Sequence, residues 1–187
     1  MDSSKPGGDL DDTDVVALVQ GGDREAFGIL VARYQKMVFA LAQRMTGSPQ
    51  EAQDVVQTSF LNAFRQIGNF RGEASFKTWV YGVALNECRM LYRKSGRTVG
   101  MDSVAEPVAP KTGGHALDRL VLGKMVGRLP EKQKAAVVLR ICDDLPFRDI
   151  GEILGTSEAS AKVNYFHAVK KLRGWVLPNP DDDGADS

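Results

Sequence analysis

Apolar residues recur at helical spacing through most of this chain, and this pattern constrains the fold more than any other feature. From Phe27 to Met45 they fall at i, i+3, i+4 and i+7, and a second series runs from Ala52 to Ile67. No segment shows the sustained period of two residues that a half-buried strand requires. The sequence therefore predicts an all-α fold.

Turn and cap residues set the expected ends of these helices. Gly47 ends the first helix, and Ser48 to Glu51 reads as a capping box with proline at the first helical position. The second helix stops at Gly68, and a loop over 69–74 leads to Ser75 as the next N-cap. The helix that follows extends to about Tyr92. We expect it to pack through Trp79, Val83 and Leu91.

A stretch without helical pattern separates two helical regions. Residues 95–116 contain four glycines and two prolines, which favours a flexible linker. Apolar periodicity resumes at Leu117 and continues past Gly127 and Pro130. We therefore expect two small helical domains joined by a linker. The expected segments are an acidic tail (1–11), a first domain (12–95), the linker (96–116), a second domain (117–177) and a second acidic tail (178–187).

Charge is balanced overall but uneven along the chain. There are 24 Lys and Arg against 24 Asp and Glu, yet 65–97 holds seven cations against two glutamates. Local fields of this kind decide whether a protein binds a polyanion. The two cysteines, Cys88 and Cys142, form no CxxC pair, so we expect neither a disulfide nor a metal. The sequence has no secretory signal and no apolar run of about 20 residues, so we expect a cytoplasmic protein without a membrane segment.

The second domain has the outline of a helix-turn-helix. A two-turn helix from Phe147 to Leu154, the turn Gly155-Thr156-Ser157 and a longer helix follow one another. A helix fits the major groove of B-DNA, and residues near its start reach base edges. An ordinary helical hairpin explains the same outline equally well. The polar residues expected to face outward on the long helix are Glu158, Ser160, Lys162, Asn164, His167, Lys171 and Arg173.

In the first domain, aromatic residues alternate with cations between Phe64 and Arg97. Aromatic rings stack on unpaired bases while cations follow the backbone, which is what binding to a single strand needs. The competing interpretation is that most of these rings belong to the core. Composition alone favours that second interpretation.

Two blocks of sequence resemble a known family. Asp54 to Phe64 and Phe70 to Asn86 are similar to the core-binding and −10-reading regions of extracytoplasmic-function sigma factors. The stretch from Leu129 to Arg173 is similar to their −35-reading domain, and the resemblance covers about residues 12–175. It implies a transcription initiation factor rather than an enzyme, without a cofactor and monomeric when free. The implied partners are core RNA polymerase (its β′ coiled coil and β flap), promoter DNA and an anti-sigma factor.

The resemblance also implies roles for individual residues. Asn86 is the best single candidate for holding a flipped base, because its side chain both donates and accepts hydrogen bonds. The residues implied at the −10 element are Asn86, Phe70, Arg71, Phe76, Lys77, Arg89, Arg93, Lys94 and Arg97. Those implied at the −35 element are Ser157, Glu158, Ser160, Lys162, Asn164, Lys170, Lys171 and Arg173. Those implied at the polymerase are Asp54, Gln57 and Asn62.

The sequence departs from the family pattern at one place, and two other functions are compatible with it. Where family members often carry Ser-Arg and Arg-Ala-Arg, this chain has Val163-Asn164 and His167-Ala168-Val169, so its long helix has fewer cations. A free-standing helix-turn-helix regulator would use the second domain alone and would not need the first block. A helical enzyme is the weakest alternative, because no P-loop, HExxH or metal-spaced Cys/His cluster is present.

Overall fold

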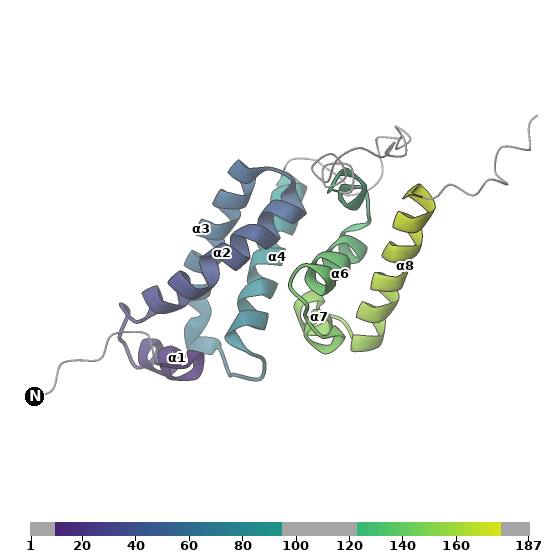
Figure 1. Ribbon diagram of the computed structural model, residues 1–187. Coiled ribbons are helices and arrows are strands. Elements are labelled where there is room, and N and C mark those ends of the chain that lie inside the picture. The colour runs from purple at the N-terminus through teal and green to yellow at the C-terminus, as the bar shows by residue number, and fades with distance from the viewer. Residues whose placement is uncertain (1–9, 95–122, 177–187) are drawn as a thin grey trace, which may run out of the picture. The chain divides into compact units, whose positions relative to one another are not determined.

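The computed structural model of the protein describes residues 10–94 and 123–176. The chain forms two compact units, Met1–Cys88 and Arg89–Ser187, and their boundary lies in the last turns of one helix (Figure 1). The predicted linker (96–116), Arg97, residues 1–9 of the first tail and the whole second tail lie outside the described residues.

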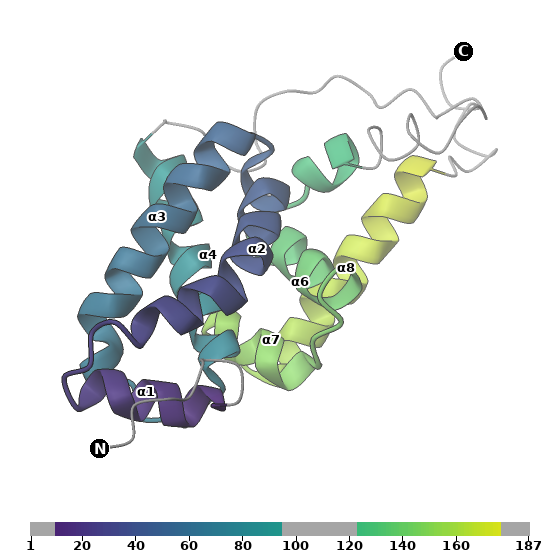
Figure 2. The same ribbon diagram turned by 60° about the vertical axis from the view of Figure 1, so that its left-hand side comes forward.

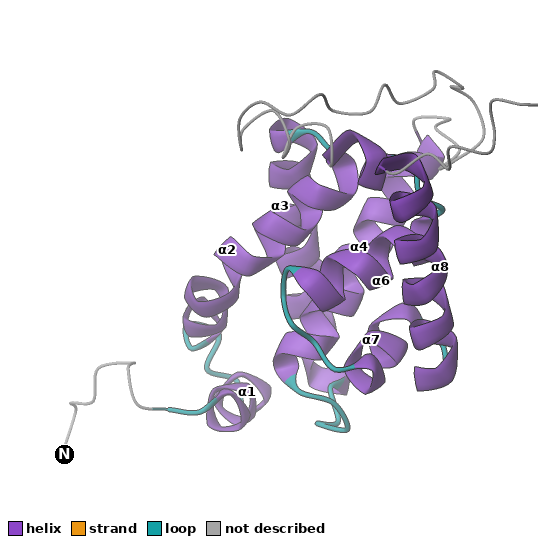
Figure 3. Ribbon diagram, turned by 45° about the vertical axis from the view of Figure 1, so that its right-hand side comes forward, coloured by secondary structure: helices purple, strands orange, loops and turns teal. Residues whose placement is uncertain are grey.

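Every regular element in these two described ranges is a helix, as Figure 3 shows by colour. The prediction of an all-α fold is therefore confirmed. None of the described helices combines the length and the apolar character that crossing a membrane requires. The same residues contain no group of three His, Cys, Asp or Glu side chains placed to hold a metal ion.

The first unit is built from four α-helices and one short 3₁₀ turn. α2 and α3 pack along each other, and α1 contacts α2 and the 3₁₀ turn η1 at one end of the unit (Figure 2). The elements are α1 (Asp12–Gln20), α2 (Phe27–Thr46), α3 (Pro49–Gln66), η1 (Ile67–Asn69) and α4 (Phe76–Lys94). Sequence reasoning placed α2, α3 and α4 within a few residues but did not identify α1.

The glycine stop and the serine N-caps predicted for this unit are present, while the Ser48 amide donates to the Thr46 hydroxyl at 3.3 Å. Gly47 ends α2 with φ of 76°, a left-handed conformation that glycine adopts without a steric penalty. The hydroxyl of Ser48 accepts from the Glu51 amide at 3.3 Å, and that of Ser75 accepts from the Thr78 amide at 3.0 Å. Each cap satisfies one of the amides that a helix start leaves without an intrahelical partner. The side chains fully buried between the helices include Leu30, Val38, Leu41, Met45, Ala63, Val80, Tyr81 and Leu85.

Polar contacts and burial hold α1 against α2. Arg33 donates to Asp12 at 2.8 Å, and the hydroxyl of Tyr34 donates to the other oxygen of the same carboxylate. Burial raises the pKa of the Tyr34 hydroxyl above its ordinary value, and the hydrogen bond to Asp12 raises it further. Tyr34 therefore stays protonated and remains a donor through the physiological pH range. Val15, Val16 and Val19 bury the inner face of α1.

In the described part of the second unit, two shorter helices pack against one long helix. A helical segment at 123–127 precedes α6 (Glu131–Ile141), α7 (Phe147–Leu154) and α8 (Glu158–Val176). α8 packs against both α6 and α7. Leu129, Val137 and Ala168 form a buried cluster, and the half-buried Tyr165, Leu172 and Trp175 pack against it.

Glycines set the turn between α7 and α8. Gly155 ends α7 with φ of 62°, and the amide of Thr156 donates to the carbonyl of Gly151 at 2.8 Å. A Cβ on Gly151 would lie 2.9 Å from the Thr156 carbonyl oxygen and 3.0 Å from the Glu158 nitrogen. Only a residue without a side chain lets α7 approach the start of α8 this closely. The predicted helix-turn-helix outline is thus present, with its two helices in direct contact.

Candidate nucleic-acid interface

The loop between η1 and α4 lies on a cluster of aromatic rings. The ring centroid of Phe70 is 5.0 Å from that of Trp79 and 6.1 Å from that of Phe76. Phe76 also packs on Trp79 and on Tyr34, at 5.6 and 5.5 Å. Phe76 is only 2% exposed, whereas Phe70 and Trp79 are half-buried. For Phe76 the structure therefore favours a place in the core, beneath the loop, over direct stacking on a base.

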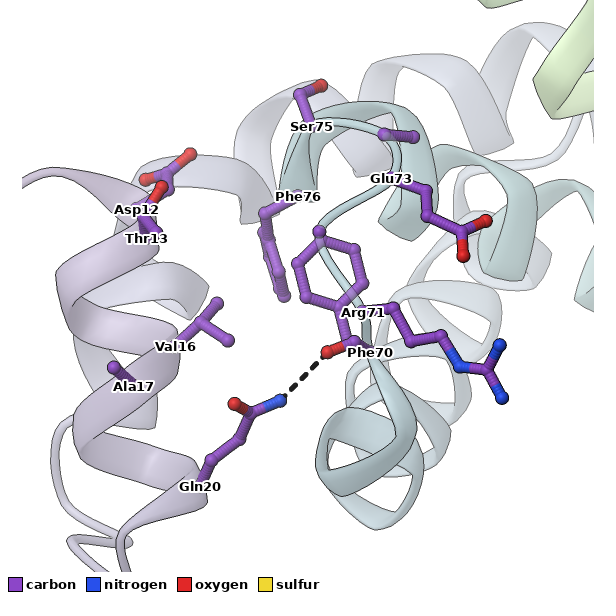
Figure 4. Close-up of a pocket in the computed structure, with 12 residues that line it drawn as sticks. Asp12, Thr13, Val16, Ala17, Gln20, Phe70, Arg71, Glu73, Ser75 and Phe76 are labelled. Carbon is purple, nitrogen blue, oxygen red and sulfur yellow. Dashed lines mark hydrogen bonds between the residues drawn. The ribbon is translucent and has the colours of Figure 1, made fainter.

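A pocket opens between this loop and α1 (Figure 4). Its volume is about 440 Å³, within the roughly 300–1,000 Å³ common for small-ligand sites. The lining combines the phenyl rings with carboxylate, hydroxyl and amide groups. The residues that line it are Asp12, Thr13, Val16, Ala17 and Gln20 of α1, and Phe70, Arg71, Gly72, Glu73, Ala74, Ser75 and Phe76.

Gln20, at the end of α1, holds the start of the loop in place. Its amide nitrogen donates to the carbonyl of Ile67 at 2.8 Å and to that of Phe70 at 2.9 Å. The dashed line in Figure 4 marks the second of these bonds. Gly72 adopts φ of 73° within the loop, which favours glycine at that position. Sequence reasoning missed Gln20 because α1 itself was not predicted, although Asp11 and the valine spacing were signals for a helix there.

Trp79, Asn86 and Arg93 lie along one face of α4. They are seven residues apart, which is close to two helical turns, so their side chains point the same way. Trp79 is half-buried beside the loop, while Asn86 and Arg93 are exposed. This face leads from the aromatic cluster to a cation near the end of the helix.

The other cations predicted for the −10 element are spread over several places. Arg71 is exposed on the loop, and Figure 4 shows its guanidinium turned away from α1. Lys77 lies over the Tyr81 ring at 5.9 Å, on the side of α4 away from Asn86. Arg89 is half-buried, and Lys94 is exposed at the last position of α4. The structure thus places Arg93 on the same face of α4 as Asn86, about two turns along, and places Lys77 on another face.

Two of the three residues predicted at the polymerase are exposed on α3. Asp54 and Gln57 lie three positions apart on its solvent side. The amide of Asn62 instead donates to the Glu87 carboxylate of α4 at 2.8 Å and is half-buried. Asn62 therefore ties α3 to α4, and the neighbouring exposed side chain is Leu61, which is 49% exposed.

The first turn of α8 uses several of its polar groups internally. The Ser157 hydroxyl accepts from the Ser160 amide at 3.1 Å, as an N-cap, and donates to the Ser160 hydroxyl at 3.0 Å. Asn164 donates to the Ser160 carbonyl at 2.8 Å. Glu158, Lys162, Lys170, Lys171 and Arg173 are exposed. The cations predicted for the −35 element are therefore accessible, whereas Ser157 and Asn164 are engaged in local hydrogen bonds.

Comparisons with known proteins agree with this arrangement. Residues 30–98 match the family described as Sigma-70 region 2, and residues 119–172 match Sigma-70, region 4. CnrH, solved in complex with the cytosolic domain of CnrY, has a similar fold, with a TM-score of 0.66 at 24% identity over 87% of this chain and 95% of that one. The sigma factor RpoE of Bartonella quintana, solved with the anti-sigma factor NepR, has a TM-score of 0.64 at 22% identity over 80% of this chain and 96% of that one.

Curated relatives align along nearly their whole length. The RNA polymerase sigma-H factor of Pseudomonas aeruginosa is 33% identical over 182 residues, which cover 89% of this chain and 94% of that one. The ECF RNA polymerase sigma-E factor of Haemophilus influenzae is 32% identical over 185 residues, which cover 90% and 97%. These matches extend over both units and so exclude a helix-turn-helix regulator that works through its second unit alone. The chain therefore belongs to the extracytoplasmic-function (ECF) sigma factors, the transcription initiation factors of bacterial RNA polymerase.

Proposed function

We propose that the first unit captures an unpaired base of the −10 element in the pocket between α1 and the loop at 70–75. The observation that supports this most is the pocket itself, which combines an aromatic floor with polar walls. Extruding a base costs a few kcal/mol, and stacking with hydrogen bonding must compensate for it. Phe70 and Trp79 supply half-buried rings, and Gln20 keeps the loop in one conformation before DNA arrives.

Asn86 and Arg93 extend this site along α4. In the proposal, Asn86 hydrogen-bonds a base edge and Arg93, with Lys94, contacts phosphates of the opened strand. Phe76 supports the rings from below rather than touching DNA. In the proposal, Arg71 contacts the DNA backbone from the outer rim of the loop, where its guanidinium points away from α1.

The second unit is proposed to bind the −35 element as duplex. α8 enters the major groove with Glu158 and Lys162 near its start, while Lys170, Lys171 and Arg173 lie further along and reach phosphates. Ser157 and Asn164 contribute by capping and stiffening the start of α8. The polymerase is proposed to hold the first unit by its β′ coiled coil, at Asp54 and Gln57, and the second unit by its β flap.

An anti-sigma factor is proposed to hold the chain inactive until it is released. The fold shared with RpoE, which was solved with the anti-sigma factor NepR, supports this. The expected result is a tight 1:1 complex in pull-downs from the native host. Recovery of core polymerase alone, with no such partner, would count against it.

Reconstituted transcription tests the proposal as a whole. The purified chain is mixed with bacterial core RNA polymerase and fragments of host DNA, and transcript starts are mapped. We expect discrete starts that share −35 and −10 elements and are lost in Asn86→Ala. Gln43→Ala, which changes an exposed amide on α2, is the matched control and should keep them. Starts that persist unchanged in Asn86→Ala would remove that residue from the −10 site, and an absence of core-dependent starts would reject the proposal.

A further inference from the structure

The outward face of α8 is unexpectedly apolar in its first three turns. Opposite the buried Ala161 and Ala168, the spacing i, i+4, i+7 and i+11 places Ala159, Val163, Phe166 and Lys170 in one row. Val163 is 51% exposed and Phe166 is 54% exposed. The Phe166 ring is outside the core and rests against the adjacent Tyr165, with ring centroids 5.5 Å apart.

The polar side chains of these turns flank the row and do not interrupt it before Lys170. Ser160 is half-buried and shares a hydrogen bond with the Ser157 hydroxyl. Asn164 is also half-buried and donates to the carbonyl of Ser160. Glu158 and Lys162 are exposed on one side of the row, and His167 is exposed on its other side. The centre of the reading face is therefore formed by the branched side chain of Val163 and the ring beside it.

Base edges in the major groove are almost entirely polar. The exception is the C5-methyl group of thymine, which valine-like and aromatic side chains contact by apolar packing. Lys162 lies beside the apolar row and Lys170 lies at its end, and positive charge there fits a polyanion better than an apolar protein groove. The occupant that matches both features is duplex DNA with thymine at the contacted positions.

We propose that Val163, with Phe166 beside it, determines promoter specificity by packing against thymine methyl groups of the −35 element. This rests on the proposed function of the second unit, and it adds the chemistry by which that unit selects bases. Selection at these positions then depends on a methyl group and not on a hydrogen bond. The selection depends on the apolar side chain at position 163. A small polar residue there would leave the thymine methyl group without a packing partner.

Deoxyuridine provides the test, because it pairs like thymine and lacks only the methyl group. Promoters mapped by reconstituted transcription are resynthesised with deoxyuridine replacing thymine at single positions of the −35 element. Binding by the full chain in complex with core polymerase is then measured. At one or two positions we expect affinity to fall about fourfold, the equivalent of roughly 0.8 kcal/mol for one buried methyl group.

Two variants distinguish methyl packing by Val163 from a general loss of DNA binding. Val163→Ser should bind thymine and deoxyuridine templates equally at the position that Val163 contacts, because its packing partner there is gone. Ile141→Ser changes another exposed apolar residue of the same unit, at the end of α6, and should keep the full thymine preference.

Three outcomes would overturn the inference. One is an affinity that does not change with deoxyuridine at any −35 position while mapped starts remain, which leaves the proposed function standing. Another is a thymine preference that persists in Val163→Ser at every sensitive position, and the third is a −35 element with no thymine on either strand. If no core-dependent starts are obtained at all, the proposed function fails and this inference fails with it.

Discussion

Removing the two hydrogen bonds of Gln20 should slow promoter opening without unfolding the protein. In Gln20→Ala the carbonyls of Ile67 and Phe70 lose their donor from α1, and water replaces it. A hydrogen bond contributes about 0.5–1.5 kcal/mol net, and because Gln20 is exposed we take the low end, about 1 kcal/mol for the pair. If that energy orders the loop before it captures a base, the loss corresponds to roughly a fivefold lower rate or yield of open complexes.

Gln20→Glu should have a larger effect than Gln20→Ala. It keeps the length of the side chain but places an acceptor-only carboxylate against two carbonyl oxygens. Open complexes are measured by permanganate reactivity of unpaired thymines, alongside duplex −35 binding and thermal unfolding. Both variants should keep −35 affinity and melting temperature near the parent values, and Gln43→Ala should match the parent in all three assays. A parental opening rate in Gln20→Glu would refute the argument that α1 orders the loop.

Two further predictions concern the helix-turn-helix. Gly151→Ala should destabilise the second unit by about 1–3 kcal/mol in denaturant unfolding, because its Cβ meets backbone at 2.9 Å; Gly174→Ala, which meets nothing within 4 Å, should be neutral or stabilising. An unchanged midpoint in Gly151→Ala would contradict the close packing of α7 on the turn. Ser157→Ala should cost about 1 kcal/mol through loss of the N-cap, whereas Ser157→Asp keeps the cap and loses duplex affinity by placing a negative charge near phosphate. Equal stability of Ser157→Ala and the parent would show that the capping bond contributes nothing.

The helices were predictable where local signals and burial agree. Ser48 and Ser75 cap helices as expected, and the apolar periodicity of α2 and α3 matches their buried faces. α1 was missed, although the expected first domain begins at residue 12, because its short apolar row of Val15, Val16 and Val19 becomes meaningful only when α2 covers it. That cover depends on contacts of Asp12 with residues more than 20 positions away, which no local pattern reveals.

The candidate site was predictable in its location but not in its details. The alternation of aromatic residues and cations indicated the region from Phe70 to Arg93, and the structure has an aromatic cluster and one wall of a pocket there. The family resemblance placed Phe76 at the −10 element, but a resemblance does not distinguish a ring that touches DNA from one that supports the site, and Phe76 is buried. In the same way, the resemblance placed Ser157 and Asn164 at the −35 element, but hydrogen bonds at the start of α8 engage the hydroxyl of Ser157 and the amide of Asn164.

The contact between Gly151 and the turn has a consequence for how promoter preference can change. The placement of α8 relative to α7 is determined by backbone atoms and by a missing side chain, on the inner side of the turn. No side chain on the outward face of α8 takes part in that contact, to which Glu158 contributes only its backbone nitrogen. Substitutions there can therefore exchange one set of preferred bases for another while the helix is presented to DNA at the same angle. In this unit, the side chains that determine base preference are therefore different from the residues that determine the geometry of the two helices.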